Sequence, residues 1–158
     1  MSQIPEVLLD TLIASTQEVF ATMVFKTLGS RTPILGEALR PASNVVGTVA
    51  FTGGRCGLVA FYSTTEAANE IAGAMLGIAA AEVNGDMPDA IGEVTNMIAG
   101  NFRTRMATHG EPWAISVPTV TIGSDFYTKY VSDVRRALCP FSMDDGRDIF
   151  VELILTQD

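Results

Sequence analysis

The sequence has few cysteines and a single histidine. The two cysteines among 158 residues, Cys56 and Cys139, cannot form a disulfide framework, so we expect reduced thiols. Any catalytic triad or Cys/His pair would have to use His109, and no nucleophile motif accompanies it. No group of Cys, His and Asp has metal-ligand spacing. The sequence therefore predicts no metal or other cofactor held by this chain, and no protein nucleophile.

Basic residues are also scarce. Ten Lys and Arg against 18 Asp and Glu give a net charge of −8, which argues against nucleic acid and anionic membrane surfaces as partners. Glu6, Asp10 and Glu18 interrupt the apolar positions near the N-terminus, so we expect neither a signal peptide nor a membrane span. These observations predict a cytoplasmic protein.

The composition is otherwise that of a globular protein. Hydrophobic residues make up 47% of the chain and charged residues 18%. This length suits one domain, residues 1–158, with a sizeable core. The high apolar content favours an oligomer or a docking face.

Hydrophobic periodicity and turn residues predict an α+β fold. The expected helices cover residues 4–27, a segment opening at 63–66 and ending near 76, and a segment from 85–88 to about 107. The expected strands cover residues 45–50, 56–62, 114–122, 131 or 134 to 141, and 149–155, with residues 28–43 mainly a connection. Short turns between strand pairs favour a largely antiparallel sheet with the helices packed on one face. Pro118, inside a predicted strand, fits only an edge or a bulge.

The most informative stretch is Asp89-Ala-Ile-Gly-Glu93-Val-Thr-Asn96-Met-Ile-Ala-Gly100-Asn. It predicts an amphipathic helix with Glu93 and Asn96 one turn apart on the same exposed face, extended by Asp89, Gly100 and Arg103. The opposite face is apolar and consists of Ile91, Val94, Ile98 and Phe102. A glycine inside a helix costs about 1 kcal/mol relative to alanine. The glycines at 92 and 100 therefore predict a close approach to the helix backbone.

The pattern Asp-x-x-x-Glu-x-x-Asn, followed about twenty residues later by a proline, resembles the signature of the CheC/CheX/FliY phosphatases of chemotaxis. The matching residues are Asp89, Glu93, Asn96 and Pro118. Twenty-one residues separate Asn96 from Pro118, one fewer than the family pattern usually has. The glycines at 92 and 100 strengthen the likeness.

The resemblance implies hydrolysis of the phosphoaspartate of a CheY-like receiver domain that supplies its own Mg²⁺. An amide both donates and accepts hydrogen bonds, so Asn96 is expected to hold the attacking water in line with the P–O bond that breaks. The resemblance implies that Glu93 pairs with the receiver's active-site lysine. Asp89, Gly92, Gly100 and Pro118 are then expected at the partner interface. A homodimer joined at strand edges is implied as well.

A weak internal repeat points to the CheX branch. When Glu18 is laid over Glu93, Ala14 falls on Asp89 and Ala21 falls on Asn96. This predicts two similar halves, of which only the second keeps the amide. In the resembling family, CheC and FliY types carry two such sites and CheX types carry one, so this chain is most similar to CheX.

Two other functions remain open at this level. The chain can be a module that binds a receiver or a flagellar-switch component without hydrolysis. It can also be a structural or sensory domain in which Glu93 and Asn96 are ordinary surface residues. Arg103 either steers a phosphate or is a surface cation near the end of a helix.

Overall fold

The computed structural model describes residues 4–36, 41, 43–124 and 133–156. Its helical segments are α1 (Glu6–Val19), the π-helical turn η1 (Phe20–Val24), α2 (Thr65–Leu76), the 3-10 turn η2 (Ala80–Glu82) and α3 (Met87–Thr108). Its strands are β1 (Gly29–Ser30), β2 (Ile34–Leu35), β3 (Val45–Gly53), β4 (Gly57–Ser63), β5 (Trp113–Ile115), β6 (Thr119–Ile122), β7 (Val134–Ser142) and β8 (Asp148–Thr156).

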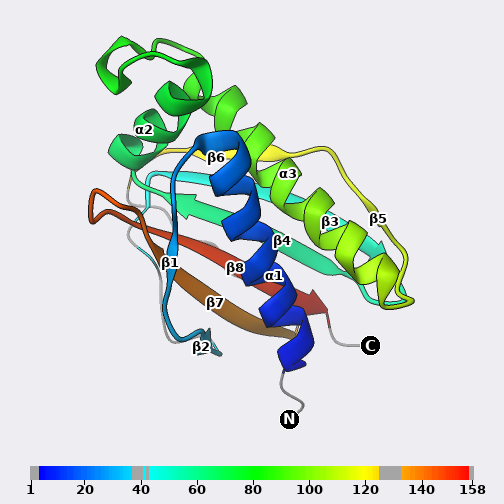
Figure 1. Ribbon diagram of the computed structural model, residues 1–158. Coiled ribbons are helices and arrows are strands. Elements are labelled where there is room, and N and C mark those ends of the chain that lie inside the picture. Colours follow the sequence, from blue (N-terminus) through cyan, green and yellow to red (C-terminus); the bar gives the residue numbers. More distant parts are fainter. Residues whose placement is uncertain (1–3, 37–40, 42, 125–132, 157–158) are drawn as a thin grey trace.

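The strands form one sheet in the order β1–β7–β8–β4–β3–β5, in which β2 also pairs with β7 and β6 with β3. All of these pairings are antiparallel. The helices α1, α2 and α3 lie together on one face of the sheet (Figure 1). The main core fills the space between these layers, with Leu8, Phe20, Phe61, Ile91 and Phe141 fully buried. The predicted α+β class is therefore confirmed.

The sheet divides into two halves of the same design. The hairpins β3–β4 and β7–β8 meet where β4 pairs with β8. The helix α1 is followed by two short strands, β1 and β2, on the outer edge of β7, and α3 is followed by β5 and β6 on the outer edge of β3. The short strands β1 and β2 of the first half thus pair with the hairpin β7–β8 of the second half, and β5 and β6 of the second half pair with the hairpin β3–β4 of the first. This exchange confirms the predicted pseudo-repeat.

The edge strands β1–β2 and β5–β6 contain equivalent bulges, and each bulge ends with a proline. Between the pairs Ile115↔Phe51 and Thr119↔Thr48, residues 116–118 oppose only residues 49 and 50. Between Ser30↔Phe141 and Ile34↔Leu138, residues 31–33 oppose only residues 139 and 140. Pro118 and Pro33 each occupy the last position of the three-residue side. The extra residue is a bulge, which is where a proline fits a sheet edge, as expected for Pro118.

Three element boundaries differ from the sequence prediction. The first helix is α-helical only to Val19, continues as the π-helical η1, and ends at Phe25 in the left-handed conformation with φ 61°. Residues 28–43, expected to be a connection, contain β1 and β2. The strand predicted over 114–122 is split into β5 and β6. Two-residue edge strands and bulges depend on their neighbours, so local periodicity does not reveal them.

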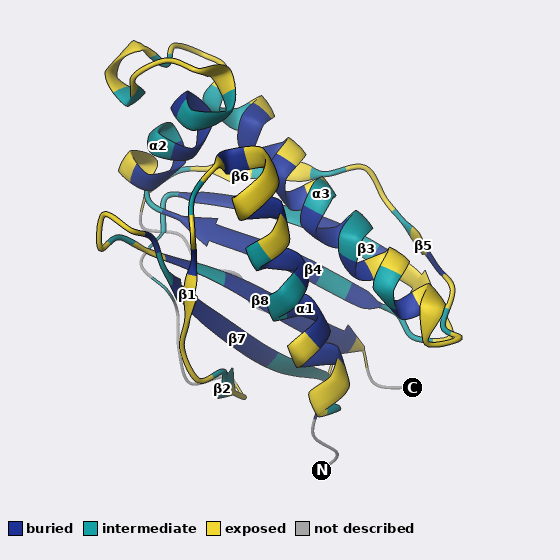
Figure 2. Ribbon diagram, viewed as in Figure 1, coloured by how far each residue is buried: buried dark blue, intermediate teal, exposed yellow. Residues whose placement is uncertain are grey.

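The first helix is apolar but belongs to the core. Residues 6–24 have a mean hydropathy of 1.3 and are, by length and composition, the only helix among the described segments able to cross a membrane. Half of that apolar stretch is buried inside the fold, and Figure 2 shows buried and exposed residues alternating along α1. This is the pattern of a helix packed on the core of a soluble domain.

The sheet face away from the helices holds a buried charge. Glu152 is 2% exposed and lies beside a smaller apolar cluster that includes Tyr62 and Leu138. Its Oε1 accepts a hydrogen bond from Tyr62 Oη at 2.6 Å, and its Oε2 accepts one from Arg136 Nε at 2.5 Å. These bonds tie β4, β7 and β8 together and offset the cost of burying the carboxylate.

Candidate functional site

The helix α3 carries the site predicted from the sequence. It begins at Met87, has a proline in its first turn, and places Asp89 in that turn, where a carboxylate favours the helix dipole. Its apolar face is buried as expected, and the buried residues are Ala90, Ile91, Gly92, Val94, Thr95, Ile98, Ala99, Phe102 and Met106. The helix is therefore anchored along its length, and its polar face points away from the core.

Glu93 and Asn96 are both exposed on that polar face, and so is Asp89. Neither the Glu93 carboxylate nor the Asn96 amide makes a hydrogen bond to another described residue. Both side chains are exposed to solvent, so their hydrogen-bonding groups can be used by a docking partner in place of water. The neighbouring Asn101 behaves differently, because its side chain is bonded within the protein.

Gly92 meets the edge of the chain's own sheet. It is buried, and a Cβ built on it would lie 3.4 Å from Val120 Cγ2 and 3.8 Å from Pro118 Cγ. The close approach that this glycine predicts is thus made by β6 and the bulge before it. The bulge brings Pro118 against the turn of α3 that carries Glu93. A contact between Gly92 and a partner protein stays a prediction.

The bulge itself is held by one serine. Ser116 donates its backbone N–H to Ala50 O at 2.8 Å, and its Oγ accepts the Ala50 N–H at 2.9 Å. The same Oγ donates to Val117 O at 2.9 Å. The backbone groups that the bulge would leave unpaired are thereby satisfied. Val117 consequently projects outward with 81% of its surface exposed.

Sequence reasoning missed the contact that seats α3 on the sheet. Gly47 lies in β3, and a Cβ built on it would collide with the side chain of Thr95, whose own Cβ would be only 3.1 Å away. Thr95 is fully buried and donates its Oγ1 hydrogen to Ile91 O at 2.8 Å. The sequence signal for this contact is a glycine among the β-branched residues of a strand, because such a glycine indicates that another element approaches the strand backbone closely.

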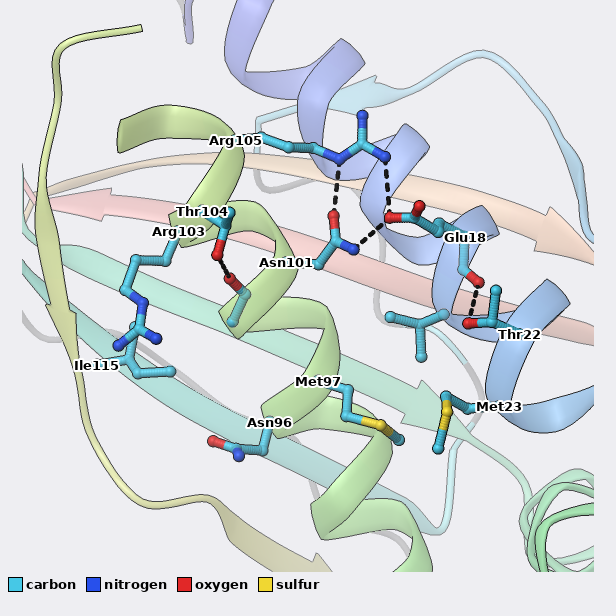
Figure 3. Close-up of a pocket in the computed structure, with 12 residues that line it drawn as sticks. Glu18, Thr22, Met23, Asn96, Met97, Asn101, Arg103, Thr104, Arg105 and Ile115 are labelled. Atoms are coloured by element: carbon cyan, nitrogen blue, oxygen red, sulfur yellow. Dashed lines mark hydrogen bonds and ion pairs between the residues drawn. The ribbon is translucent and has the colours of Figure 1, made fainter. Parts of the chain in front are cut away.

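A groove of about 670 Å³ opens beside Asn96 and crosses the exposed face of α3, from the end of α1 with η1 on one side to Ile115 of β5 on the other (Figure 3). It is open to solvent. Its lining residues are Glu18, Val19, Thr22, Met23, Asn96, Met97, Gly100, Asn101, Arg103, Thr104, Arg105 and Ile115. Glu93 does not line it. A Cβ built on Gly100 would meet no atom within 4 Å, so this glycine leaves free space in the groove.

The helices α1 and α3 are linked at the groove by a three-residue network. Arg105 Nη2 on α3 donates to Glu18 Oε2 on α1 at 3.0 Å, and Arg105 Nε donates to Asn101 Oδ1 at 2.7 Å. Asn101 Nδ2 also donates to Glu18 Oε2. These bonds, first that from Asn101 and then that from Arg105, lower the pKa of the Glu18 carboxyl. Glu18, the counterpart of Glu93 in the internal repeat, therefore joins the two helices.

The first half of the repeat keeps no amide at its exposed position. Ala21, which the repeat aligns with Asn96, is exposed in η1.

Among the residues that the structure describes, no group of three or more His, Cys, Asp and Glu side chains is placed to hold a metal ion. The polar residues of α3 thus present an acid and an amide on an open surface.

Comparisons with known proteins identify the fold and the family. No curated protein sequence matches the chain. The fold is similar to the crystal structure of a chemotaxis protein CheX from Desulfovibrio desulfuricans, with a TM-score of 0.84 and 26% identity over 94% of this chain and 99% of that one.

Two further structures are less similar in sequence. The CheX–CheY–BeF3–Mg²⁺ complex from Borrelia burgdorferi has a TM-score of 0.77 and 20% identity over 95% of this chain and 98% of that one. FliY from Thermotoga maritima has a TM-score of 0.75 and 18% identity over 98% and 92%. At these identities the likeness shows the shared fold.

The family model described as chemotaxis phosphatase CheX matches residues 45–142. That range is more than half of the chain, and it includes the whole of α3 and the Pro118 bulge. The family suggested by the sequence signature is therefore confirmed, and this chain belongs to the CheX family of chemotaxis phosphatases.

Proposed function

We propose that this protein hydrolyses the phosphoaspartate of a CheY-like response regulator in chemotaxis or related two-component signalling. The observation that carries the proposal is the exposed pair Glu93 and Asn96, one helical turn apart, with no hydrogen bond to other described residues. Family membership supports the phosphatase activity in general. The Borrelia complex holds a CheX with a CheY, which supports a receiver domain as the partner.

Asn96 positions the attacking water. The amide oxygen accepts a hydrogen bond from the water and the amide N–H₂ donates to it or to the phosphoryl group, which aligns the water with the P–O bond to the aspartate. The water oxygen then bonds to phosphorus, the receiver's aspartate carboxylate leaves, and inorganic phosphate departs with the water's proton lost to solvent. The acyl phosphate is already reactive, so positioning supplies the acceleration.

Glu93 anchors the receiver. Its carboxylate pairs with the lysine of the receiver's active site, and the docked helix shields this pair from water, which strengthens the bond. The anchor sets the angle at which α3 approaches the phosphoryl group and so places Asn96. The receiver also brings the Mg²⁺, and this chain contributes no cofactor.

The remaining predicted site residues have supporting roles. Asp89, Gly92, Gly100 and Pro118 lie along α3 or directly against it and form the rim of the docking surface. The protein acts in the cytoplasm, where receivers are found, and forms a homodimer through its exposed strand edges.

The test is the decay of a phosphorylated receiver from the same organism in magnesium buffer, with and without the protein. We expect faster decay with the wild-type protein, and loss of at least about 100-fold in kcat for Asn96→Ala, as for other groups that position a reactant. The matched control is Asn84→Ala, which removes an exposed asparagine outside α3. Full activity in Asn96→Ala would overturn the mechanism.

The same assay separates the alternative function. If the protein binds the phosphorylated receiver and leaves its lifetime unchanged, it is a receiver-binding or flagellar-switch adaptor. The fold it shares with FliY is compatible with that outcome.

A further inference from the structure

We propose that the groove that crosses α3 from η1 to β5 is a second contact for the same receiver. It takes an apolar side chain of the receiver against Met23 and Met97, and an acidic side chain at Arg103. The inference rests on the proposed function, because it assumes that the receiver's phosphoryl group faces Asn96.

The groove is continuous with the proposed catalytic position. Asn96, Gly100 and Arg103 all line it, and their spacing of four and three residues places them in one row along α3. A receiver that reaches Asn96 therefore covers the groove as well. Seven residues of helix span about 10 Å along the axis. We therefore assign Arg103 to an acidic side chain of the receiver beside the phosphoryl group that faces Asn96.

Arg103 is the available cation of this row. It is exposed and makes no ion pair with any residue that the structure describes, whereas the neighbouring Arg105 is bonded to Glu18. Figure 3 shows its side chain running along α3 beside Ile115, toward the end of the groove that holds Asn96. Side chains on a helix lean toward its N-terminus, over the residue three or four positions earlier.

Gly100 is the residue over which Arg103 leans. A Cβ at Gly100 would meet nothing within 4 Å, so packing inside the protein does not explain this helix glycine. Because Gly100 has no side chain, the space between Asn96 and Arg103 stays open. A docking group of the receiver explains why that space is useful.

The side of the groove nearest η1 is apolar and adaptable. Met23 is 41% exposed and comes from the π-helical η1, and Met97 is half-buried on α3. Methionine side chains adjust to the shape of a docked group, and π-helical turns occur frequently at functional sites. The groove is open and combines two methionines with two arginines, of which Arg105 is bonded to Glu18 and Arg103 has no ion pair among the described residues. These properties fit a protein surface with an apolar residue beside an acid.

The test measures binding and turnover separately. The probe is the receiver loaded with beryllium fluoride and Mg²⁺ for binding by calorimetry, and the phosphorylated receiver for steady-state hydrolysis. We expect Arg103→Gln and Met23→Ala each to raise Kd and KM about five- to tenfold, with kcat changed less than about twofold, as for the loss of an interface contact. Arg103→Glu should weaken binding further, because it places like charges together.

Arg147→Gln is the matched control. It removes the same charge from a half-exposed arginine in the turn between β7 and β8, whose ion pairs are with Glu70 and Asp145, and it should leave Kd and KM unchanged. Thermal unfolding of each variant checks that the fold is intact.

Unchanged Kd in both Arg103→Gln and Met23→Ala would overturn the groove as a receiver contact, and so would a loss of kcat at unchanged Kd. Different results would contradict the catalytic role of Asn96 and the receiver contact in the groove. Full activity of Asn96→Ala contradicts the catalytic mechanism, whereas the binding measurement with the loaded receiver decides the groove even if no hydrolysis occurs.

Discussion

Thr95, in the turn of α3 between Glu93 and Asn96, packs directly against the bare Cα of Gly47 in β3. The threonine is fully buried, and its hydrogen bond to Ile91 O holds the side chain in place. The distance between α3 and the sheet is therefore set by the absence of a side chain at Gly47. Because Glu93 and Asn96 flank Thr95, the same contact sets their height above the sheet.

Gly47→Ala should displace α3 and destabilise the protein. The added methyl group collides with Thr95, and overpacking of this kind costs about 1–3 kcal/mol. Urea unfolding measures the loss, and receiver dephosphorylation should fall with it. Gly54→Ala is the control, since a Cβ there meets nothing within 4 Å. Thr95→Ala in the Gly47→Ala background should recover part of the stability, and a simple sum of the two single losses would contradict the proposed contact.

Gly100→Ala should stabilise the protein by about 1 kcal/mol, because alanine favours the helix and the new Cβ has free space. Gly100→Leu should keep the fold and weaken binding of the loaded receiver, since its side chain fills the groove. Thermal unfolding and calorimetry measure the two effects on the same samples. A stable Gly100→Leu variant with wild-type affinity would show that the space above Gly100 is not used.

The link between α1 and α3 should depend on pH. Hydrogen bonds from Asn101 and Arg105 lower the pKa of Glu18 in the folded protein. Folding therefore favours the ionised carboxylate. The contribution of Glu18 to the free energy of unfolding is fully present above the pKa that this residue has in the unfolded chain, and it is lost as the pH falls through its lower pKa in the folded protein. The stability advantage of wild type over Glu18→Gln should shrink below about pH 4.3, the ordinary pKa of glutamate. Urea midpoints from pH 7 to 3 test this, and a constant difference would show that charge is not involved.

Thiol labelling should distinguish the two cysteines. Burial raises the pKa of Cys139 to about 12, with a smaller contribution from Glu152, so almost no thiolate forms at pH 8. Cys56 is only half-buried. The folded protein should therefore react with a thiol reagent at Cys56 alone, and the unfolded protein at both cysteines. Labelling of Cys139 in the folded protein would contradict its burial between the helices and the sheet.

The exposed and buried faces of α3 were predictable from the sequence. Helical periodicity is a local property, so Ile91, Val94 and Ile98 identify the buried face, and Glu93 and Asn96 follow on the other. The overall class was predictable for the same reason, because short turns force neighbouring strands to pair. The repeat was detectable only through its two helices.

The tertiary structure alone decided what each site residue contacts. Pro33 and Pro118 occupy equivalent bulges, but they follow Ala21 and Asn96 at different distances along the chain, so the sequence does not align them. Gly92 lies against Val120 and Pro118 of this chain, and the role of Gly47 is visible only once Thr95 is seen packed against it.

The groove beside Asn96 arises in the same way. Two of its lining residues, Glu18 and Asn101, are 83 residues apart in the sequence and are joined by a hydrogen bond in the fold. The sequence by itself determined the helix that presents Glu93 and Asn96, because its apolar residues recur about every 3.6 positions and this spacing depends only on nearby residues. The surface around them was decided by packing between distant segments, whose register depends on the whole sheet.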